Sequence, residues 1–228
     1  MITLYDLAFD KDLRPSPFCW RAKFAMAHKH LKWTEVPTGF TEKHKIAFAE
    51  SKTVPVIQDG NTPVKDSWAI AVHLDAEYPE HLLLKNEMGH AYSQFINGWA
   101  DTIVNVGVFP LIVGDLFERV RPEDKAYFTE SRSARLGTSD FMGFQNKARE
   151  KGLAPFRGVL EPVRRTLRHQ EFLSGAEPAY PDYILAGSFM WPRSVSPLEL
   201  LEKDDPIYAW RERMLDLYDG MARKAKTA

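Results

Sequence analysis

The chain has 228 residues, enough to bury a substantial core in one large domain or in two small domains that share an interface. Its 30 Lys and Arg residues balance 31 Asp and Glu residues, and a net charge of -1 provides no field that would gather nucleic acid or an anionic membrane surface. The first ten residues do not have the pattern of a secretory signal, so we expect none. The longest apolar stretch, Ile103 to Gly114, is shorter than the roughly 20 residues that span a bilayer, and we expect a cytoplasmic protein with neither nucleic acid nor membrane as a partner.

The first half of the N-terminal region predicts a strand, a helix and a second strand. Residues 2–7 alternate apolar side chains as a strand does, and residues 32–36 repeat that pattern. Between them, Ser16 provides an N-cap hydroxyl and Pro17 fits the first helical position, so we expect a helix that runs to about His30. Residues 41–50 predict a short helix or a loop.

The second half of this region predicts a hairpin and a helix. Residues 54–58 and 63–65 flank an Asp-Gly-Asn turn, whose residues supply the positive φ angles that a hairpin needs. Ser67 is the expected cap of the following helix, which Pro79 ends. The order of elements predicts an α/β domain of the thioredoxin-like type over residues 1–80.

From residue 87 onward the strand pattern is replaced by helical spacing of apolar residues. We expect one helix from Phe156 to Leu167 and another from Ile207 to Met221. Arg164, Arg165 and Arg168 fall on the polar side of the first, where they predict a solvated face. Residues 87–228 are therefore interpreted as an all-helical second domain.

The pair Val54-Pro55 lies inside an otherwise good strand, where proline removes a backbone donor. One interpretation is an edge strand, which tolerates proline. The other is a cis Val54-Pro55 bond that turns the N–H and C=O of Val54 toward an extended peptide ligand. The fragment alone leaves both open.

The pair Asp66-Ser67 lies at a strand-to-helix turn. Ser67 and the free N–H groups behind it suit a carboxylate, and Asp66 suits an ammonium group, so together they fit the head of an amino acid. The plainer interpretation is that Ser67 caps the helix and Asp66 is exposed.

A third fragment, Ser16-Pro17-Phe18-Cys19, opens the first helix. The helix dipole and a hydrogen bond from the Ser16 hydroxyl would stabilise a thiolate bound there and lower the pKa of the thiol. A serine cap followed by proline is also common without any ligand.

In this order and near these spacings, the three fragments resemble the glutathione transferase superfamily, over nearly the whole chain. The resemblance implies the glutathione transferase fold, an α/β thioredoxin-like N-terminal domain plus an all-α C-terminal domain. It also implies glutathione as co-substrate, no metal, and a homodimer. Ser16 would be the catalytic residue that activates the thiol, Val54-Pro55 would pair with the cysteinyl backbone, and Asp66 with Ser67 would hold the γ-glutamyl head. Pro17 and Phe18 join Ser16 among the expected glutathione-binding residues.

Two longer strings narrow the resemblance to the bacterial β-etherase-like branch, whose members cleave aryl ethers with glutathione. They are Ser16-Pro17-Phe18-Cys19-Trp20-Arg21-Ala22-Lys23 and Asp66-Ser67-Trp68.

The chain departs from the superfamily pattern at two points. Ala179 stands where a Ser or Thr cap is usual before the Pro181-Asp182 helix start, so Asp182 must stabilise that turn in another way. Thr53 stands where a basic residue often precedes Val-Pro. Lys52 is therefore the expected partner of the glycine carboxylate, with His44 as the alternative.

Phe109, Phe189 and Trp191 are candidates for the apolar wall of a second, electrophile-binding pocket between the domains, although aromatic residues at helical spacing often belong to the core. Cys19 lies where related oxidoreductases keep the second thiol of a Cys-x-x-Cys pair. With serine at position 16, we interpret it as a small apolar residue. No histidine spacing predicts a metal site.

The function predicted first is transfer of the glutathione thiolate to an apolar, aromatic electrophile, with aryl-ether cleavage as one form of it. The alternatives are a glutathione-binding or regulatory protein without turnover and, third, a glutathione-dependent thiol oxidoreductase.

Overall fold

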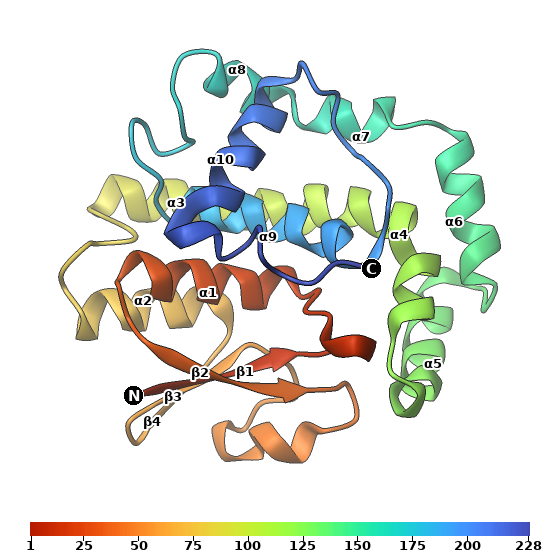
Figure 1. Ribbon diagram of the computed structural model, residues 1–228, viewed down its shortest axis with the longest axis horizontal. Helices are drawn as coiled ribbons and strands as arrows, with labels where there is room; N and C mark the ends of the chain where they lie inside the picture. The colour runs from red at the N-terminus through yellow and green to blue at the C-terminus, as the bar shows by residue number, and fades with distance from the viewer.

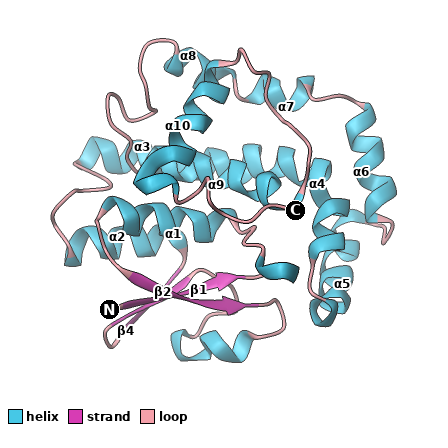
Figure 2. Cartoon of the chain, viewed as in Figure 1, coloured by secondary structure: helices cyan, strands magenta, loops and turns pink.

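Four short strands near the N-terminus form one mixed sheet, and every other regular element of the chain is helical (Figure 2). The computed structural model describes residues 1–228. In the sheet, β1 pairs in parallel with β2, and antiparallel with β3, which in turn pairs antiparallel with β4. The strands are β1 (Ile2–Leu7), β2 (Trp33–Thr38), β3 (Val56–Asp59) and β4 (Thr62–Lys65). The expected strand–helix–strand and hairpin order is confirmed, with shifts of one or two residues.

Two helices cover one face of this sheet. Alternate residues of β1 are buried beneath them, and α1 buries ten of its twelve residues because it is covered on its other side as well. The expected second side of the hairpin begins one residue earlier than predicted, at Thr62. The covering helices are α1 (Pro17–His28) and α2 (Ser67–Glu77), and a 3₁₀ segment, Lys43–Ala49, connects β2 to β3.

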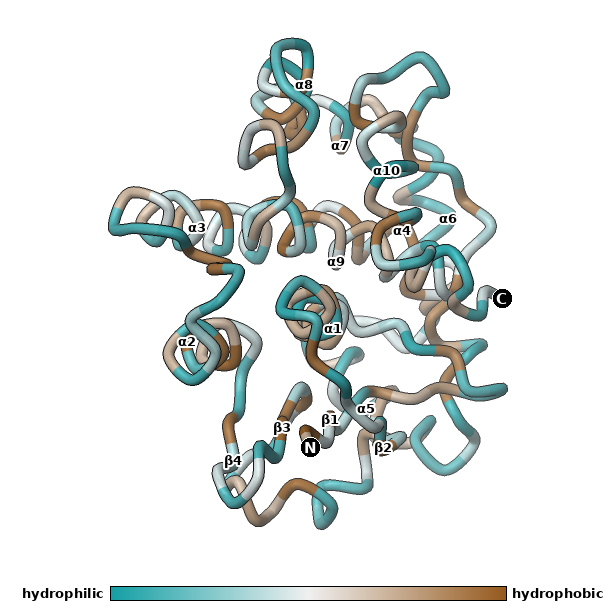
Figure 3. Tube along the Cα trace, turned by 60° about the vertical axis from the view of Figure 1, so that its left-hand side comes forward, coloured by the Kyte–Doolittle hydropathy of each residue, from teal (hydrophilic) through white to brown (hydrophobic).

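Most of the remaining helices pack as a second body above α1, whereas α5 extends down on the right of the view, to the side of the strands (Figure 1). In Figure 3, α1 lies between the strands on one side and the layer that contains α3 and α9 on the other. Helix α9 buries nearly all of its residues, so it forms the centre of the helical part. The helices are α3 (Glu87–Trp99), α4 (Asn105–Arg119), α5 (Lys125–Leu136), α6 (Phe141–Glu150), α7 (Ala154–Val159), α8 (Glu161–Leu167), α9 (Tyr180–Val195) and α10 (Pro206–Gly220).

Helices α3 and α4 are joined by a π-helical turn, Ala100–Val104, into one continuous rod. The apolar stretch Ile103 to Gly114 therefore belongs to a helix of 33 residues, Glu87–Arg119, that is long and apolar enough to cross a membrane. This corrects the expectation that the stretch is too short. More than half of its most apolar window is buried inside the protein, as in the core helix of a soluble domain.

The expected helix from Phe156 to Leu167 is two helices, because the chain breaks at Leu160 between α7 and α8. Pro162, which has no N–H, takes an early position in α8. The expected solvated face is confirmed for Arg165 and Arg168, which are exposed, but not for Arg164. Arg164 donates hydrogen bonds to Asp205 and Glu161, so it ties α8 to the N-terminus of α10.

The turn before α9 is held by the fully buried carboxylate of Asp182. It accepts hydrogen bonds from the backbone N–H groups of Leu173, Ser174 and Ala179, and from the indole N–H of Trp210. Asp182 therefore replaces the missing Ser or Thr cap at Ala179 and joins three segments of the helical part.

Candidate active site

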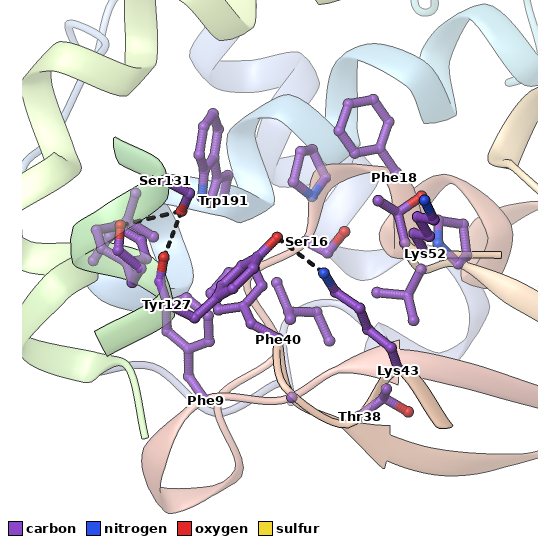
Figure 4. Close-up of a pocket in the computed structure, with 18 of the residues that line it drawn as sticks. Phe9, Ser16, Phe18, Thr38, Phe40, Lys43, Lys52, Tyr127, Ser131 and Trp191 are labelled. Atoms are coloured by element: carbon purple, nitrogen blue, oxygen red, sulfur yellow. Dashed lines mark hydrogen bonds between the residues drawn. The ribbon is translucent and has the colours of Figure 1, made fainter. Parts of the chain in front are cut away.

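A cleft of about 570 Å³ opens between the N-terminal part and the helices α4, α5 and α9. In Figure 4, Ser16, Lys43 and Tyr127 point into it from different segments of the chain. The cleft brings together most of the residues that the sequence singles out, which are Ser16, Pro17, Phe18, Lys52, Val54, Pro55, Asp66, Phe109 and Trp191.

Ser16 is the N-cap of α1. Its Oγ accepts a hydrogen bond of 3.2 Å from the N–H of Cys19, which is the expected cap. The hydroxyl proton stays free to be donated to a ligand, because an Oγ that accepts one bond still carries its own donor. Pro17 has no N–H, and the N–H of Phe18 has no partner. Two donors therefore remain at this helix start, the Ser16 hydroxyl and the Phe18 amide.

Val54 borders the cleft with an unpaired backbone. The Val54-Pro55 peptide bond is cis. Neither the N–H nor the C=O of Val54 forms a hydrogen bond with the protein, and the segment lies just before β3. Unpaired backbone groups beside a sheet are suited to pairing with an extended peptide.

Asp66 occupies the turn after β4, with φ of +76°. It, and not Ser67, is the N-cap of α2, because its Oδ1 accepts hydrogen bonds from the N–H groups of Trp68 at 2.8 Å and Ala69 at 3.2 Å. Ser67 is the first residue of the helix, is buried, and does not line the cleft. The expected Ser67 cap is therefore wrong. The other oxygen of Asp66, Oδ2, has no partner and is available to an ammonium group.

Lys52 lines the cleft with an exposed side chain that forms no ion pair or hydrogen bond. His44 is also exposed but does not line the cleft. Of the two basic residues considered for a carboxylate, only Lys52 lies at the site.

An aromatic wall lies on the helical side of the cleft. Phe109 of α4 and Trp191 of α9 stack with ring centroids 5.9 Å apart. Phe189 does not join them. It packs against Trp210 in the interior of the helical part, on another side of α9. Residues two apart on a helix point in different directions, so Phe189 and Trp191 face different surroundings.

Several lining residues have no signal in the sequence. Tyr127 and Arg132 come from α5, and Lys43 comes from the 3₁₀ segment after β2. The Lys43 ammonium lies 4.5 Å from the centre of the Tyr127 ring, so the two segments meet across the cleft. Only the folded arrangement brings α5 beside the segment that follows β2, since no local pattern in α5 indicates a site.

Cys19 is fully buried behind Ser16. Burial raises the pKa of its thiol well above the usual range, and the nearby carboxylate of Asp6 raises it further. The thiol therefore stays protonated and inaccessible, which does not suit a redox nucleophile.

The histidines do not gather with other ligand types. No group of three or more His, Cys, Asp and Glu side chains is arranged to hold a metal ion. The ring of His28 instead forms a hydrogen bond of 2.7 Å with the hydroxyl of Tyr183, between α1 and α9.

The sheet, the helical body and the cleft between them define a thioredoxin-like domain joined to a helical domain, the architecture of the glutathione transferases. The family models agree. The glutathione S-transferase N-terminal domain matches residues 15–77, and the C-terminal domain matches residues 91–215. The chain belongs to the glutathione S-transferase family.

Among solved structures, the chain is similar to a glutathione S-transferase of Ceriporiopsis subvermispora in complex with glutathione, with a TM-score of 0.76, 19% identity, and 96% of each chain covered. It is also similar to a theta-class enzyme of Xanthomonas axonopodis pv. citri with glutathione bound, with a TM-score of 0.66, 21% identity, and 100% and 98% covered. At these identities the likeness shows the fold.

Among curated proteins, glutathione S-transferase Z1 of Arabidopsis thaliana is 28% identical over 114 residues. The match covers 46% of this chain, and the chain spans about half the length of that relative.

Proposed function

We propose that this protein binds glutathione in the cleft and transfers its thiolate to an apolar, aromatic electrophile. One observation carries the proposal: the Ser16 helix start, the unpaired Val54 backbone and the free Asp66 oxygen border one cleft. A tripeptide with a thiol, a peptide backbone and an amino-acid head has a complementary group for each. Lys52 supplies a cation for its glycine carboxylate, and Pro17 and Phe18 line the wall beside the thiol.

The thiol is activated by its position at the start of α1, a helix of twelve residues. The positive end of the helix dipole and a hydrogen bond from the Ser16 hydroxyl stabilise the thiolate and lower the pKa of the thiol. The thiolate then attacks the electrophilic carbon. A carbon–sulfur bond forms, and the leaving group departs with the electron pair of the bond that breaks.

The second substrate stacks against Phe109 and Trp191, the paired rings on the opposite side of the cleft. Aromatic electrophiles fit such a wall because offset stacking adds to their buried area. Aryl ethers are one class with this chemistry. For them the leaving group is a phenolate or an alkoxide, as the resemblance to the β-etherase-like branch suggests.

Conjugation of glutathione to chlorodinitrobenzene tests the proposal in three proteins: wild type, Ser16→Gly and Ser16→Thr. Glycine is preferred to alanine here because it remains acceptable at an N-cap, with a loss of only a few tenths of a kcal/mol. We expect Ser16→Gly to lower kcat about 10²-fold with little change in KM for glutathione, while Ser16→Thr, which keeps the hydroxyl, retains most of the rate.

Three outcomes distinguish the alternatives. An unchanged kcat in Ser16→Gly would move the activating role to the free N–H of Phe18. Glutathione binding by calorimetry without any thioether product, over a panel of aryl ethers, halides and epoxides, would favour the binding or regulatory protein. No binding of glutathione at all would contradict the proposal.

We also propose a cytoplasmic homodimer of chains divided into domains 1–80 and 87–228. The support for the dimer is an apolar surface on the α3–α4 rod, where Met88 is 77% and Phe95 69% exposed, with Ile103 and Val106 further along. Exposed apolar side chains in such number on one element are typical of an interface. Analytical ultracentrifugation at micromolar concentration should give twice the chain mass, and Phe95→Lys should shift the protein toward monomer. A wild-type protein with the mass of a single chain would contradict the proposed homodimer.

A further inference from the structure

Two arginines of α5, Arg132 and Arg135, line the cleft without any acidic partner. Neither forms an ion pair, and Arg135 forms no hydrogen bond either. The only hydrogen bond of Arg132 runs 2.8 Å from one guanidinium nitrogen to the Oγ of Ser131, the adjacent residue. Most arginines elsewhere in the chain pair with a carboxylate. The cleft therefore contains guanidinium donors that no group of this chain satisfies.

Both guanidinium groups are positioned by aromatic rings of the cleft. The Cζ of Arg132 lies 5.1 Å from the centre of the Phe40 ring and 5.0 Å from that of Phe128. The Cζ of Arg135 lies 5.2 Å from the centre of the Phe109 ring, which itself stacks on Trp191. The rings contact the guanidinium groups, and apart from the one bond to Ser131 the N–H groups have no partner in the protein.

The two arginines are also close enough to act on each other. Burial lowers the pKa of Arg132, and the charge of Arg135 lowers it further. A desolvated cation beside a second cation gains stability when an anion binds between or beside them.

The charges around the cleft are unbalanced. Lys43, Lys52, Arg132 and Arg135 line it, against one acidic residue, Asp66, although the whole chain is nearly neutral. Glutathione offers a carboxylate to Lys52, on the strand side. The arginines belong to α5, and Arg135 lies over Phe109 on the helical side, where the second substrate is proposed to stack.

We propose that the second substrate is an aromatic acid, whose ring stacks on Phe109 and Trp191 and whose carboxylate is bound by Arg135 and Arg132. This inference rests on the proposed function in one respect: that the aromatic acid is the second substrate. The binding of an aromatic acid to this part of the cleft does not depend on it. It turns an apolar electrophile into an amphipathic one with a fixed orientation. The anionic group is held at α5, and the ring is directed along the aromatic wall toward the thiol site at Ser16.

Calorimetry with an unreactive pair of probes, dinitrobenzoate and its neutral amide dinitrobenzamide, tests the inference without turnover. The probes share ring and nitro groups, so their affinity ratio isolates the carboxylate. We expect wild type to bind dinitrobenzoate about tenfold or more tightly than the amide, because a charge-assisted hydrogen bond contributes at least that factor. Arg135→Gln and Arg132→Gln should each reduce the ratio severalfold, toward equal affinity for the two probes, with unchanged affinity for glutathione.

Arg168→Gln is the matched control, because Arg168 is exposed, forms no ion pair and lies in the helical part away from the cleft. It removes the same charge and should leave the ratio unchanged. Arg135 is also exposed, so Arg135→Gln should fold even if Arg132→Gln, which removes a stacked group, does not.

Equal affinity of wild type for the two probes, or an affinity ratio that Arg135→Gln leaves unchanged, would overturn the inference. The arginines would then have only a packing role against the aromatic rings. An affinity for glutathione that falls with either variant, at a constant ratio, would overturn it too and assign the arginines to glutathione. Failure of the proposed function has a different signature: dinitrobenzoate binds with the expected ratio, but no thioether forms from glutathione and chlorodinitrobenzene.

Discussion

Replacing Asp66 by Asn separates the ligand-binding role of this residue from its structural one. The Oδ1 atom that accepts from the N–H groups of Trp68 and Ala69 is present in both side chains, and Asn is as good an N-cap as Asp. Asn has nearly the same size and shape as Asp, so the strained backbone at this position, with φ of +76° and ψ of +136°, is equally unfavourable for both residues. Only the negative charge and the free carboxylate oxygen are lost.

The magnitude follows from the exposure of the site. A buried charge-assisted hydrogen bond is worth about 1.5–3 kcal/mol, but Asp66 is exposed, where ion pairs contribute about 1 kcal/mol or less. We take a value between these two cases, about 1–1.5 kcal/mol, because a bound γ-glutamyl head would itself partly cover the carboxylate that faces its ammonium group. This corresponds to a loss of about tenfold in affinity for glutathione. Loss of the charge at the start of α2 should lower the free energy of unfolding by no more than about 1 kcal/mol.

Isothermal titration with two ligands tests this reasoning. Glutathione should bind Asp66→Asn about tenfold more weakly than wild type. Glutaryl-cysteinyl-glycine, which lacks only the ammonium group, should bind both proteins equally. A variant that binds glutathione as tightly as wild type, or that loses the same factor for both ligands, would refute the assignment of Asp66 to the ammonium group.

Three further predictions concern two buried residues, Asp182 and Cys19, and one that is partly buried, His28. Asp182→Ala leaves four N–H donors, including the indole of Trp210, without their acceptor. Urea denaturation should therefore show a free energy of unfolding lower by about 4 kcal/mol or more. A loss below about 1 kcal/mol would contradict the role of Asp182 as the acceptor that holds this turn. Burial lowers the pKa of His28 to about 4, whereas the unfolded chain binds the proton near pH 6.5. The free energy of unfolding should therefore fall by up to about 3 kcal/mol as pH falls from about 6.5 to about 4. His28→Gln should lack this decrease. An equal pH dependence of stability in the two proteins would contradict the assignment to His28. Cys19→Ala should keep conjugating activity within about twofold, because a buried, protonated thiol takes no part in conjugation. Deglutathionylation activity that survives Ser16→Gly but is abolished by Cys19→Ala would instead favour the oxidoreductase alternative.

The order of elements in the N-terminal half could be predicted because each depends on a few adjacent residues. Ser16 followed by Pro17 marks a helix start in any context, and a proline inside a strand pattern marks Val54-Pro55 as special. The turn at Asp66 was also visible. The sequence places its cap one residue late, at Ser67, because only the backbone angles distinguish Asp66 outside the helix from Ser67 inside it.

The helical side of the cleft could be predicted only in part. Periodicity shows that a residue is on an apolar face but not which neighbour covers that face. Trp191 faces the cleft, whereas Phe189 faces Trp210. Because residues two apart on a helix point in different directions, their spacing indicates that only one of them lines the cleft, but it does not show which one. Arg132 and Arg135 carried no signal at all, because their place depends on how α5 crosses the end of the sheet.

The division of α7 from α8 had a local signal that helical spacing concealed. Phe156, Leu160 and Val163 keep the spacing of a single helix although the axis breaks between them. Pro162 indicates the start of a new helix, since proline is favoured in the first turn of a helix and disrupts a helix interior.

The ionisation of bound glutathione tests the central claim most directly. Its thiolate can be followed by ultraviolet absorbance while pH is varied, in wild type and in Ser16→Gly. The account predicts that the bound thiol has a pKa at least one unit below the value of about 8.5 for a free thiol, and that Ser16→Gly moves it back toward that value. A bound thiol that titrates like free glutathione in the wild-type protein would contradict the claim that this cleft activates it.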